Sequence, residues 1–237
     1  MRRILLAATA LVAFSTVAVA ADMPVKAPAY AAPAPMFNWT GFYIGGNVGA
    51  AWENLTTTDV DGFAALATPG TRTKLHDTGF IGGGQLGYNF QSGNWLVGIE
   101  GDIGWLDLGK KRFITGTTSS TQVGIDSGLY ADVTGRIGYI TNNNALWYAK
   151  GGWVYYNGDR LFSTTAGFTA GNIGSFSGWT AGGGVEWLIG PNWTAKIEYQ
   201  HFDFGTERFA LTPPTFRFDE KLRVDVVKVG LNWKFGN

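Results

Sequence analysis

The amino-acid sequence predicts an all-β protein, an eight-stranded antiparallel up-and-down transmembrane β-barrel. Three observations support this fold class. Long segments alternate apolar and polar side chains, short turns alternate with long polar connections, and aromatic residues stand at both ends of nearly every apolar face. Such alternation places one face of each strand against an apolar medium and the other against a polar interior.

The N-terminal residues are predicted to lie outside this barrel. In residues 1–21, two arginines precede an apolar run that ends in small residues, which is typical of a secretory signal peptide. A membrane anchor is the alternative, but the run is shorter than the roughly 20 apolar residues that span a bilayer. Residues 22–37 are rich in Ala and Pro and are expected to form an extended periplasmic tail, which leaves 38–237 for the barrel.

Composition excludes several classes of function. Charged residues make up 15% of the chain and the formal net charge is zero. Soluble proteins carry about 25% charged residues, and nucleic-acid-binding proteins show a basic excess. The absence of cysteine excludes disulfides, thiol catalysis and cysteine-based metal sites.

Eight alternating segments are expected to form the strands of the barrel. They are residues 40–52, 77–90, 94–108, 127–140, 145–157, 176–189, 192–205 and 223–235. The short separators 91–94, 141–144 and 190–192 are rich in Gly, Asn, Pro and Ser, and are predicted to be periplasmic turns. The long polar separators 53–76, 109–126, 158–175 and 206–222 are expected to be loops outside the cell.

Aromatic residues mark the ends of the outward faces. Trp95 and Trp105 stand ten residues apart in one segment. With about 3.3 Å per residue and a tilt near 40°, ten residues rise about 25 Å, the height of the apolar band of such barrels. The predicted aromatic girdle comprises Trp52, Phe80, Phe90, Trp95, Trp105, Tyr139, Trp147, Tyr155, Trp179, Trp187, Trp193 and Trp233.

The opposite faces carry charges that are expected to point into the lumen, because an unpaired charge in hydrocarbon is costly. The predicted lumen charge network is Glu100, Asp102, Asp132, Arg136, Lys150, Glu186, Lys196, Glu198 and Lys228. Near balance of five acids and four bases favours cross-lumen ion pairs, and an eight-stranded interior is just wide enough for side chains to fill. A plugged barrel is therefore expected. Glycines on the same face leave volume, so a narrow conducting path stays open as the alternative.

A soluble lipocalin-like barrel or a β-sandwich would place the apolar face inside. Neither explains tryptophan at both ends of the apolar faces, nor a polar face filled with glycine in place of lysine and glutamate. The hairpins recur about every 50 residues, as repeats do, but each unit has two strands where a propeller blade needs four. The pattern therefore favours the membrane barrel.

Few residues indicate chemistry. The two histidines, His76 and His201, are expected near the outer rim, where haem or metal ligation and a plain polar role are both open. No catalytic motif is present, so no enzyme activity, cofactor or metal is expected. Residues 110–113 and 206–222 combine basic and aromatic side chains, which suit lipopolysaccharide phosphates, anionic ligands or host surfaces; solvated loops are the plainer alternative.

Particular stretches resemble a known family. Residues 38–52, NWTGFYIGGNVGAAW, follow ADMPVKAPA, and GGGQLGYNF, GIEGDIGW, GRIGY and VKVGLNWKF occur downstream. In these motifs the whole chain after residue 21 is similar to the small outer-membrane β-barrel proteins of alphaproteobacteria, the porin-family immunogenic surface antigens. The resemblance implies an abundant, surface-exposed protein of the bacterial outer membrane, in contact with its lipids and lipopolysaccharide. Some members are named porins and a few bind haem, so both stay alternatives to a structural role.

Overall fold

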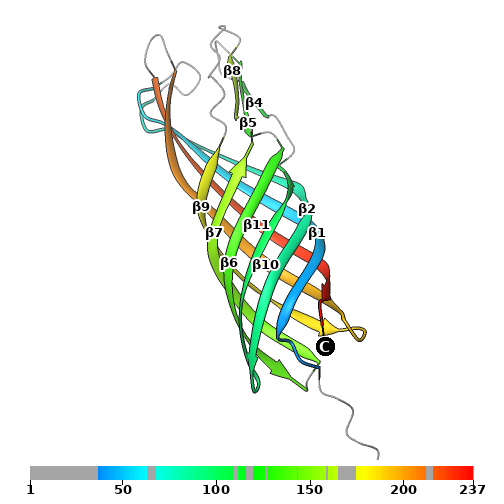
Figure 1. Cartoon of the computed structure of the whole chain (residues 1–237). Helices are drawn as coiled ribbons and strands as arrows, with labels where there is room; N and C mark the ends of the chain where they lie inside the picture. The colour runs from blue at the N-terminus through cyan, green and yellow to red at the C-terminus, as the bar shows by residue number, and fades with distance from the viewer. Residues whose placement is uncertain are drawn as a thin grey trace, which may run out of the picture. The chain divides into compact units, whose positions relative to one another are not determined.

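The computed structural model describes residues 37–62, 68–108, 112–115, 120–125, 127–142, 144–158, 160–164, 175–211 and 216–236. Its main feature is a closed barrel in which every neighbouring strand pair is antiparallel (Figure 1). The barrel strands are β1 (Gly41–Asp59), β2 (Arg72–Ser92), β3 (Trp95–Asp107), β6 (Gly128–Thr141), β7 (Ala145–Asn157), β9 (Phe176–Leu188), β10 (Trp193–Leu211) and β11 (Phe216–Lys234).

The order around the barrel is β1-β11-β10-β9-β7-β6-β3-β2, so consecutive barrel strands are neighbours and the first strand closes against the last. The predicted fold class is therefore confirmed. Within the described ranges, no helix is long and apolar enough to cross a membrane.

Short connections join strands at one end of the barrel, called here the turn end. Gly93 (φ 59°) lies between β2 and β3, and Asn142 (φ 50°) lies between β6 and β7. These are left-handed conformations that Gly and Asn tolerate. The third short connection follows Leu188, and all three fall where the sequence predicts turns.

The opposite end, called here the loop end, differs from the prediction in two hairpins. Residues 53–76 and 206–222 were expected to be loops. In the structure, the pairing of β1 with β2 extends as far as Thr58↔Arg72, and the pairing of β10 with β11 extends as far as Leu211↔Phe216. The prediction of loops is wrong there for a physical reason. Both faces of these extensions carry many polar side chains, so the apolar alternation that reveals a strand in the membrane fades while the backbone ladder continues.

The other two long connections also contain strands. β4 (Arg112–Thr115) and β5 (Ser120–Ile125) lie between β3 and β6, and β8 (Arg160–Thr164) lies between β7 and β9. They form a separate sheet of order β4-β5-β8. Pairing of Thr121 with Thr164 ties the two connections together. These strands were not predicted within 109–126 and 158–175.

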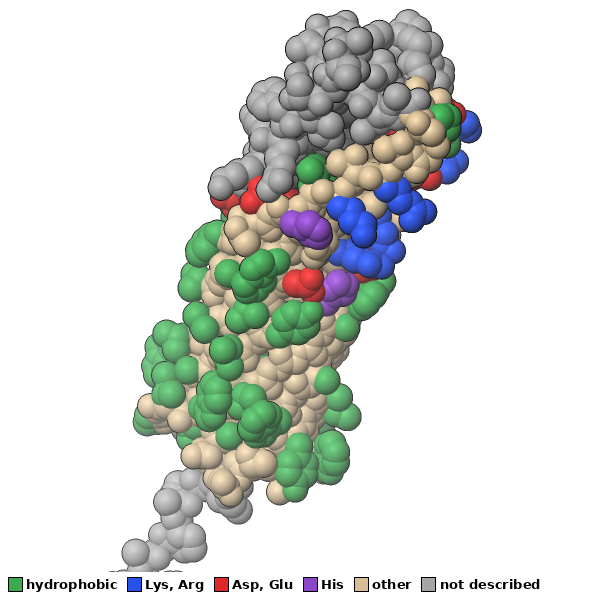
Figure 2. All heavy atoms as spheres, turned by 180° about the vertical axis from the view of Figure 1, so that it is seen from behind, with side chains coloured by type: hydrophobic (Ala, Val, Ile, Leu, Met, Phe, Trp, Pro, Cys, Tyr) green, Lys and Arg blue, Asp and Glu red, His purple; other side chains and the backbone are tan. Residues whose placement is uncertain are grey.

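Side-chain alternation in the barrel follows the predicted parity. Trp95 and Trp105 are 59% and 55% exposed, whereas Leu96 and Leu106 are fully buried. All residues of the predicted girdle except the half-buried Tyr155 are exposed on the outer wall. Figure 2 shows the resulting green apolar side chains over the lower wall. The outer surface of the barrel is thus apolar between the two rows of aromatic residues, where it is suited to hydrocarbon.

Candidate functional site

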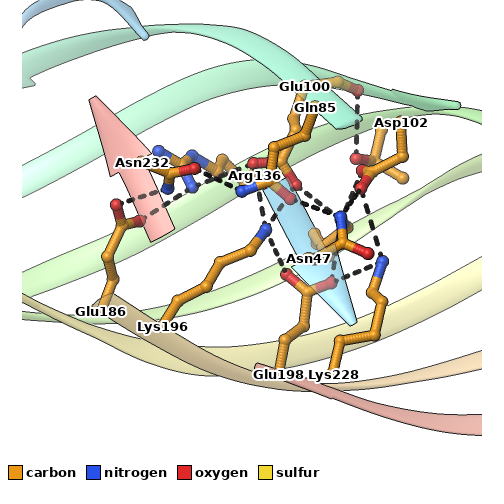
Figure 3. A network of polar contacts seen from close by, with 12 residues as sticks. Asn47, Gln85, Glu100, Asp102, Arg136, Glu186, Lys196, Glu198, Lys228 and Asn232 are labelled. Carbon is orange, nitrogen blue, oxygen red and sulfur yellow. Dashed lines mark hydrogen bonds and ion pairs between the residues drawn. The ribbon is translucent and has the colours of Figure 1, made fainter. Parts of the chain in front are cut away.

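The centre of the barrel interior holds a network of ion pairs (Figure 3). Glu100 on β3 receives three cations, each from a different strand. Its carboxylate oxygens lie 3.5 Å from Arg136 Nη1, 2.7 Å from Lys150 Nζ and 3.3 Å from Lys196 Nζ. None of these side chains is exposed to solvent. Buried charges of this kind are tolerated only when they are paired.

A second group of contacts joins Lys150 and Lys228 to shared carboxylates. Lys150 Nζ lies 3.4 Å from Asp102 Oδ2 and 3.2 Å from Glu198 Oε1. Lys228 Nζ lies 3.5 Å from Asp102 Oδ1 and 3.1 Å from Glu198 Oε1. Because every cation meets at least two acids, the network crosses the lumen in several directions.

Eight of the nine residues predicted for the network form ion pairs. Glu186 joins the network through Arg136, whose Nη1 lies 3.3 Å from Glu186 Oε2. Asp132 is the exception. It has no ion pair among the described residues, and its Oδ2 accepts a hydrogen bond from Gln200 Nε2 at 3.2 Å. Without Asp132, four acids face four bases.

Two tyrosines complete the network, and the sequence reasoning missed both. Tyr43 Oη donates to Glu100 Oε2 at 2.7 Å, and Tyr148 Oη donates to Glu198 Oε2 at 2.7 Å. The Arg136 guanidinium lies between their rings, 4.7 Å from the Tyr43 centroid and 5.3 Å from the Tyr148 centroid. Their positions in the alternation, opposite in parity to the outward Phe42 and Trp147, were the signal that could have found them.

Apolar side chains fill the interior on both sides of the network. The loop-end tier contains Leu55, Ile81, Leu106, Tyr130, Val154, Tyr156, Phe176, Phe202, Phe204, Leu222, Val224 and Val226. The turn-end tier contains Trp39, Leu96, Ile140, Leu146 and Tyr148, with Phe37 packed against it. The inward face of β3 shows the whole order, from Leu96 through Glu100 and Asp102 to Leu106. The polar residues of the inward faces predicted a polar lumen, and neither apolar tier was predicted.

The inner-face glycines do not leave empty space at the positions that border the network. A Cβ at Gly87 would collide with the ring of Tyr43, and a Cβ at Gly184 would lie 2.9 Å from the Tyr148 hydroxyl. A Cβ at Gly98 would lie 2.6 Å from Asn89 Oδ1. Neighbouring side chains therefore occupy the volume that these glycines release.

The two histidines lie apart on the outer wall. His76 Nδ1 is 2.6 Å from Asn54 Oδ1, and His201 Nδ1 is 2.7 Å from Asp225 Oδ1. β1 and β11 separate their strands, which puts about 14 Å between them at about 4.8 Å per strand. Ligands of one metal ion lie about 2 Å from it, so the two cannot share an ion. Among the described residues, no group of three or more His, Cys, Asp or Glu is arranged to hold a metal.

Comparison with known proteins agrees with this architecture. The 31 kDa outer-membrane immunogenic protein of Brucella melitensis is 33% identical over 99% of this chain and 100% of its own length. The 22 kDa outer membrane protein of Rhizobium leguminosarum is 29% identical over 91% of this chain and 83% of its own. The crystal structure of OprG from Pseudomonas aeruginosa superposes with a TM-score of 0.55, covering 86% of this chain and 100% of that one at 12% identity, which supports the fold alone.

The family assignment rests on most of the chain. The sequence model of the outer membrane protein beta-barrel domain matches residues 7–235, which include every strand of the closed barrel. Together with the Brucella and Rhizobium relatives, this match places the protein in the bacterial outer membrane. The chain belongs to the outer membrane protein beta-barrel family.

Proposed function

We propose that the protein is a structural, surface-exposed component of the cell envelope, and that its barrel is a plugged scaffold without catalytic activity. The observation that supports this proposal is the layered interior: a buried ion-pair network between two apolar tiers. The names of the relatives, outer-membrane immunogenic proteins, support exposure at the cell surface.

The energetics of the interior favour closure. Opening a path through the network would separate charges that are held within 2.7 to 3.5 Å of each other. Opening a path through the tiers would expose fully buried side chains such as Phe202 and Leu146 to water. Each step opposes conduction, because buried pairs lose much stability when a partner is removed and apolar area costs about 25 cal/mol per Å² to expose.

We place the turn end in the periplasm and the loop end outside the cell. Residues 1–36, which include the predicted signal peptide and most of the predicted periplasmic tail, lie outside the described residues. Short turns on one rim and longer connections on the other are the usual arrangement in such barrels. In this orientation the apolar wall contacts outer-membrane lipids, and the hairpin tips and the β4-β5-β8 sheet belong to connections that face the surroundings. Contact with surface ligands would fall to these connections.

Single-channel recording tests the plug. The purified protein is refolded into planar bilayers, and a heat-modified gel shift verifies the folded barrel. A closed lumen gives no reproducible conductance steps at moderate salt. Discrete steps from the verified wild type would contradict the plug and favour the narrow diffusion channel. In that case Arg136→Gln and Lys150→Gln should change the ion selectivity of the steps.

A further inference from the structure

The outer wall formed by β2, β1, β11 and β10 carries a group of cations just beyond the apolar band. Outward side chains at matched register are Lys74, Thr56 and Lys221 in one row, and His76, Asn54 and Arg223 in the row below. Arg72 extends the group along β2. We call Arg72, Lys74, Lys221 and Arg223 the basic patch. Figure 2 shows blue side chains gathered beside the two purple histidines, above the green band.

The basic patch is poorly neutralised. Arg223 Nε lies 2.9 Å from Asp203 Oδ2, and Lys221 Nζ lies 4.0 Å from the same oxygen. Arg72 and Lys74 have no ion pair among the described residues. Asp225, which lies two residues after Arg223 on the same face, is the second carboxylate that acts on Arg223. Four cations therefore face two carboxylates, which leaves an excess positive charge on the wall.

Cations nearer the hairpin tips, by contrast, are neutralised by carboxylates. Arg208 Nε lies 2.6 Å from Asp219 Oδ1, and Arg217 Nη2 lies 2.7 Å from Asp61 Oδ1. Each of these arginines is matched by its own carboxylate. Among the described residues of these four strands, the excess charge thus lies at the level of the wall just above the aromatic girdle.

A groove runs along the same four strands below the basic patch and reaches β9. It encloses about 1330 Å³, and its lining includes Phe80, Ile44, Val48, Ile197, Val229 and Trp193. Gly46 forms part of its floor, where a Cβ would meet nothing closer than 3.7 Å. The groove exists because outward positions here, such as Gly46 and Gly82, carry glycine in place of larger side chains.

We propose that this wall binds lipid A, the phosphorylated lipid of lipopolysaccharide, with its phosphates on the basic patch and an acyl chain in the groove. Arginine and lysine form strong charge-assisted hydrogen bonds with phosphate oxygens. Arg223 and Val229, the first residue of β11 that lines the groove, are six residues apart, about 20 Å along the strand. The charges therefore lie at the height of a headgroup whose acyl chains enter the apolar band. The inference is independent of whether the lumen conducts.

Native mass spectrometry of the folded protein in detergent tests this assignment. The probes are bisphosphorylated lipid A, its dephosphorylated form, phosphatidylglycerol and inorganic phosphate. We expect lipid A to bind most tightly, and dephosphorylated lipid A and phosphatidylglycerol to bind at least tenfold more weakly. Inorganic phosphate at equal concentration should not compete, because it cannot occupy the groove.

Two pairs of variants test the two halves of the site. The double variant Arg72→Gln, Lys74→Gln should weaken lipid A binding by about thirtyfold, and Arg208→Gln, Arg217→Gln, which removes the same charge from the paired arginines, should change it less than threefold. Gly46→Val fills the groove and should weaken lipid A binding about tenfold. Its control is Gly101→Val on β3, where the nearest atom to a Cβ is also a backbone oxygen at 3.7 Å.

Several results would overturn the proposal. Equal loss in both charge variants would indicate a general electrostatic attraction. Equal binding of phosphatidylglycerol or dephosphorylated lipid A would remove lipid A as the occupant, and competition by inorganic phosphate would make the patch a free-anion site. Unchanged lipid A binding in Gly46→Val would show that no acyl chain occupies the groove. Because only the folded species is counted in the spectra, poor folding of a variant does not imitate loss of binding.

Discussion

Tyr43 and Gly87 are cross-strand partners on β1 and β2, and the tyrosine ring occupies the place where a side chain at residue 87 would begin. The missing side chain on one strand allows the aromatic ring on the next to reach Glu100, 2.7 Å from its hydroxyl. Glycine in this lumen therefore positions larger neighbours and does not by itself create a channel.

This relationship predicts strong coupling between the two positions. Gly87→Ala should lower the free energy of unfolding by about 1 to 3 kcal/mol in the wild type, because the methyl group collides with the ring. In a Tyr43→Ala background the same substitution should cost little. Urea unfolding of the refolded barrel, analysed as a double-mutant cycle, measures this difference. Additive effects would show that the ring moves away at no cost.

Removal of one central cation should strongly destabilise the barrel. Lys150→Met leaves Glu100 and Glu198 short of a partner, and we expect about 3 to 5 kcal/mol lower stability. Lys74→Met, on the outer wall and without an ion pair among the described residues, is the matched control and should have a small effect in lipid without phosphate headgroups. The measurement is urea unfolding of both variants in the same bilayer. Similar stabilities would contradict a structural role for the network.

The loop-end tier should be as sensitive as a soluble protein core. Phe202 is fully buried, and Phe202→Ala should cost about 3 to 5 kcal/mol by leaving a cavity. Phe80→Ala on the outer wall should cost less, since mobile lipid chains fill the space. Thermal gel-shift midpoints compare the two variants. A smaller loss for Phe202→Ala than for Phe80→Ala would mean that the tier is loosely packed.

An ion pair at the loop end should respond to acid. Hydrogen bonds from Arg217 lower the pKa of Asp61 to about 2, from an ordinary value of 3.8. Because the folded-state pKa is the lower one, the stabilisation is present above about pH 4 and is lost as the pH falls toward 2. Carboxyl NMR titration of the folded barrel should give a midpoint near 2, and Arg217→Gln should return it toward 3.8. A wild-type midpoint already near 3.8 would contradict the pair in solution.

The sequence predicts the membrane part of the barrel well because the membrane imposes alternation. Trp95 to Trp105 can be assigned an outward face from parity alone, and the structure agrees. Beyond the apolar band that constraint ends. The run Thr56 to Thr58 shows no apolar face, so its continuation of β1 follows only from pairing with β2 and β11.

The interior is harder to predict because inward side chains in the lumen are both polar and apolar. Leu96 and Leu106 share the parity of Glu100, yet apolar residues were considered mainly as outward ones. Parity identifies which side chains enter the lumen, but only contacts between distant strands show that they form layers. The pairing of particular charges has the same origin, since Glu100 and Lys196 are brought together only by closure of the barrel.

Closure also sets a condition on assembly. β1 is paired with β11 from Tyr43↔Lys234 to Asp59↔Phe218, so the first strand completes its hydrogen bonds only after the last has been synthesised. A chain that stops before Phe216 would leave two unpaired edges in hydrocarbon, where each unmet backbone group is costly. We therefore expect a chain that lacks β11 to be unable to close its barrel in the membrane.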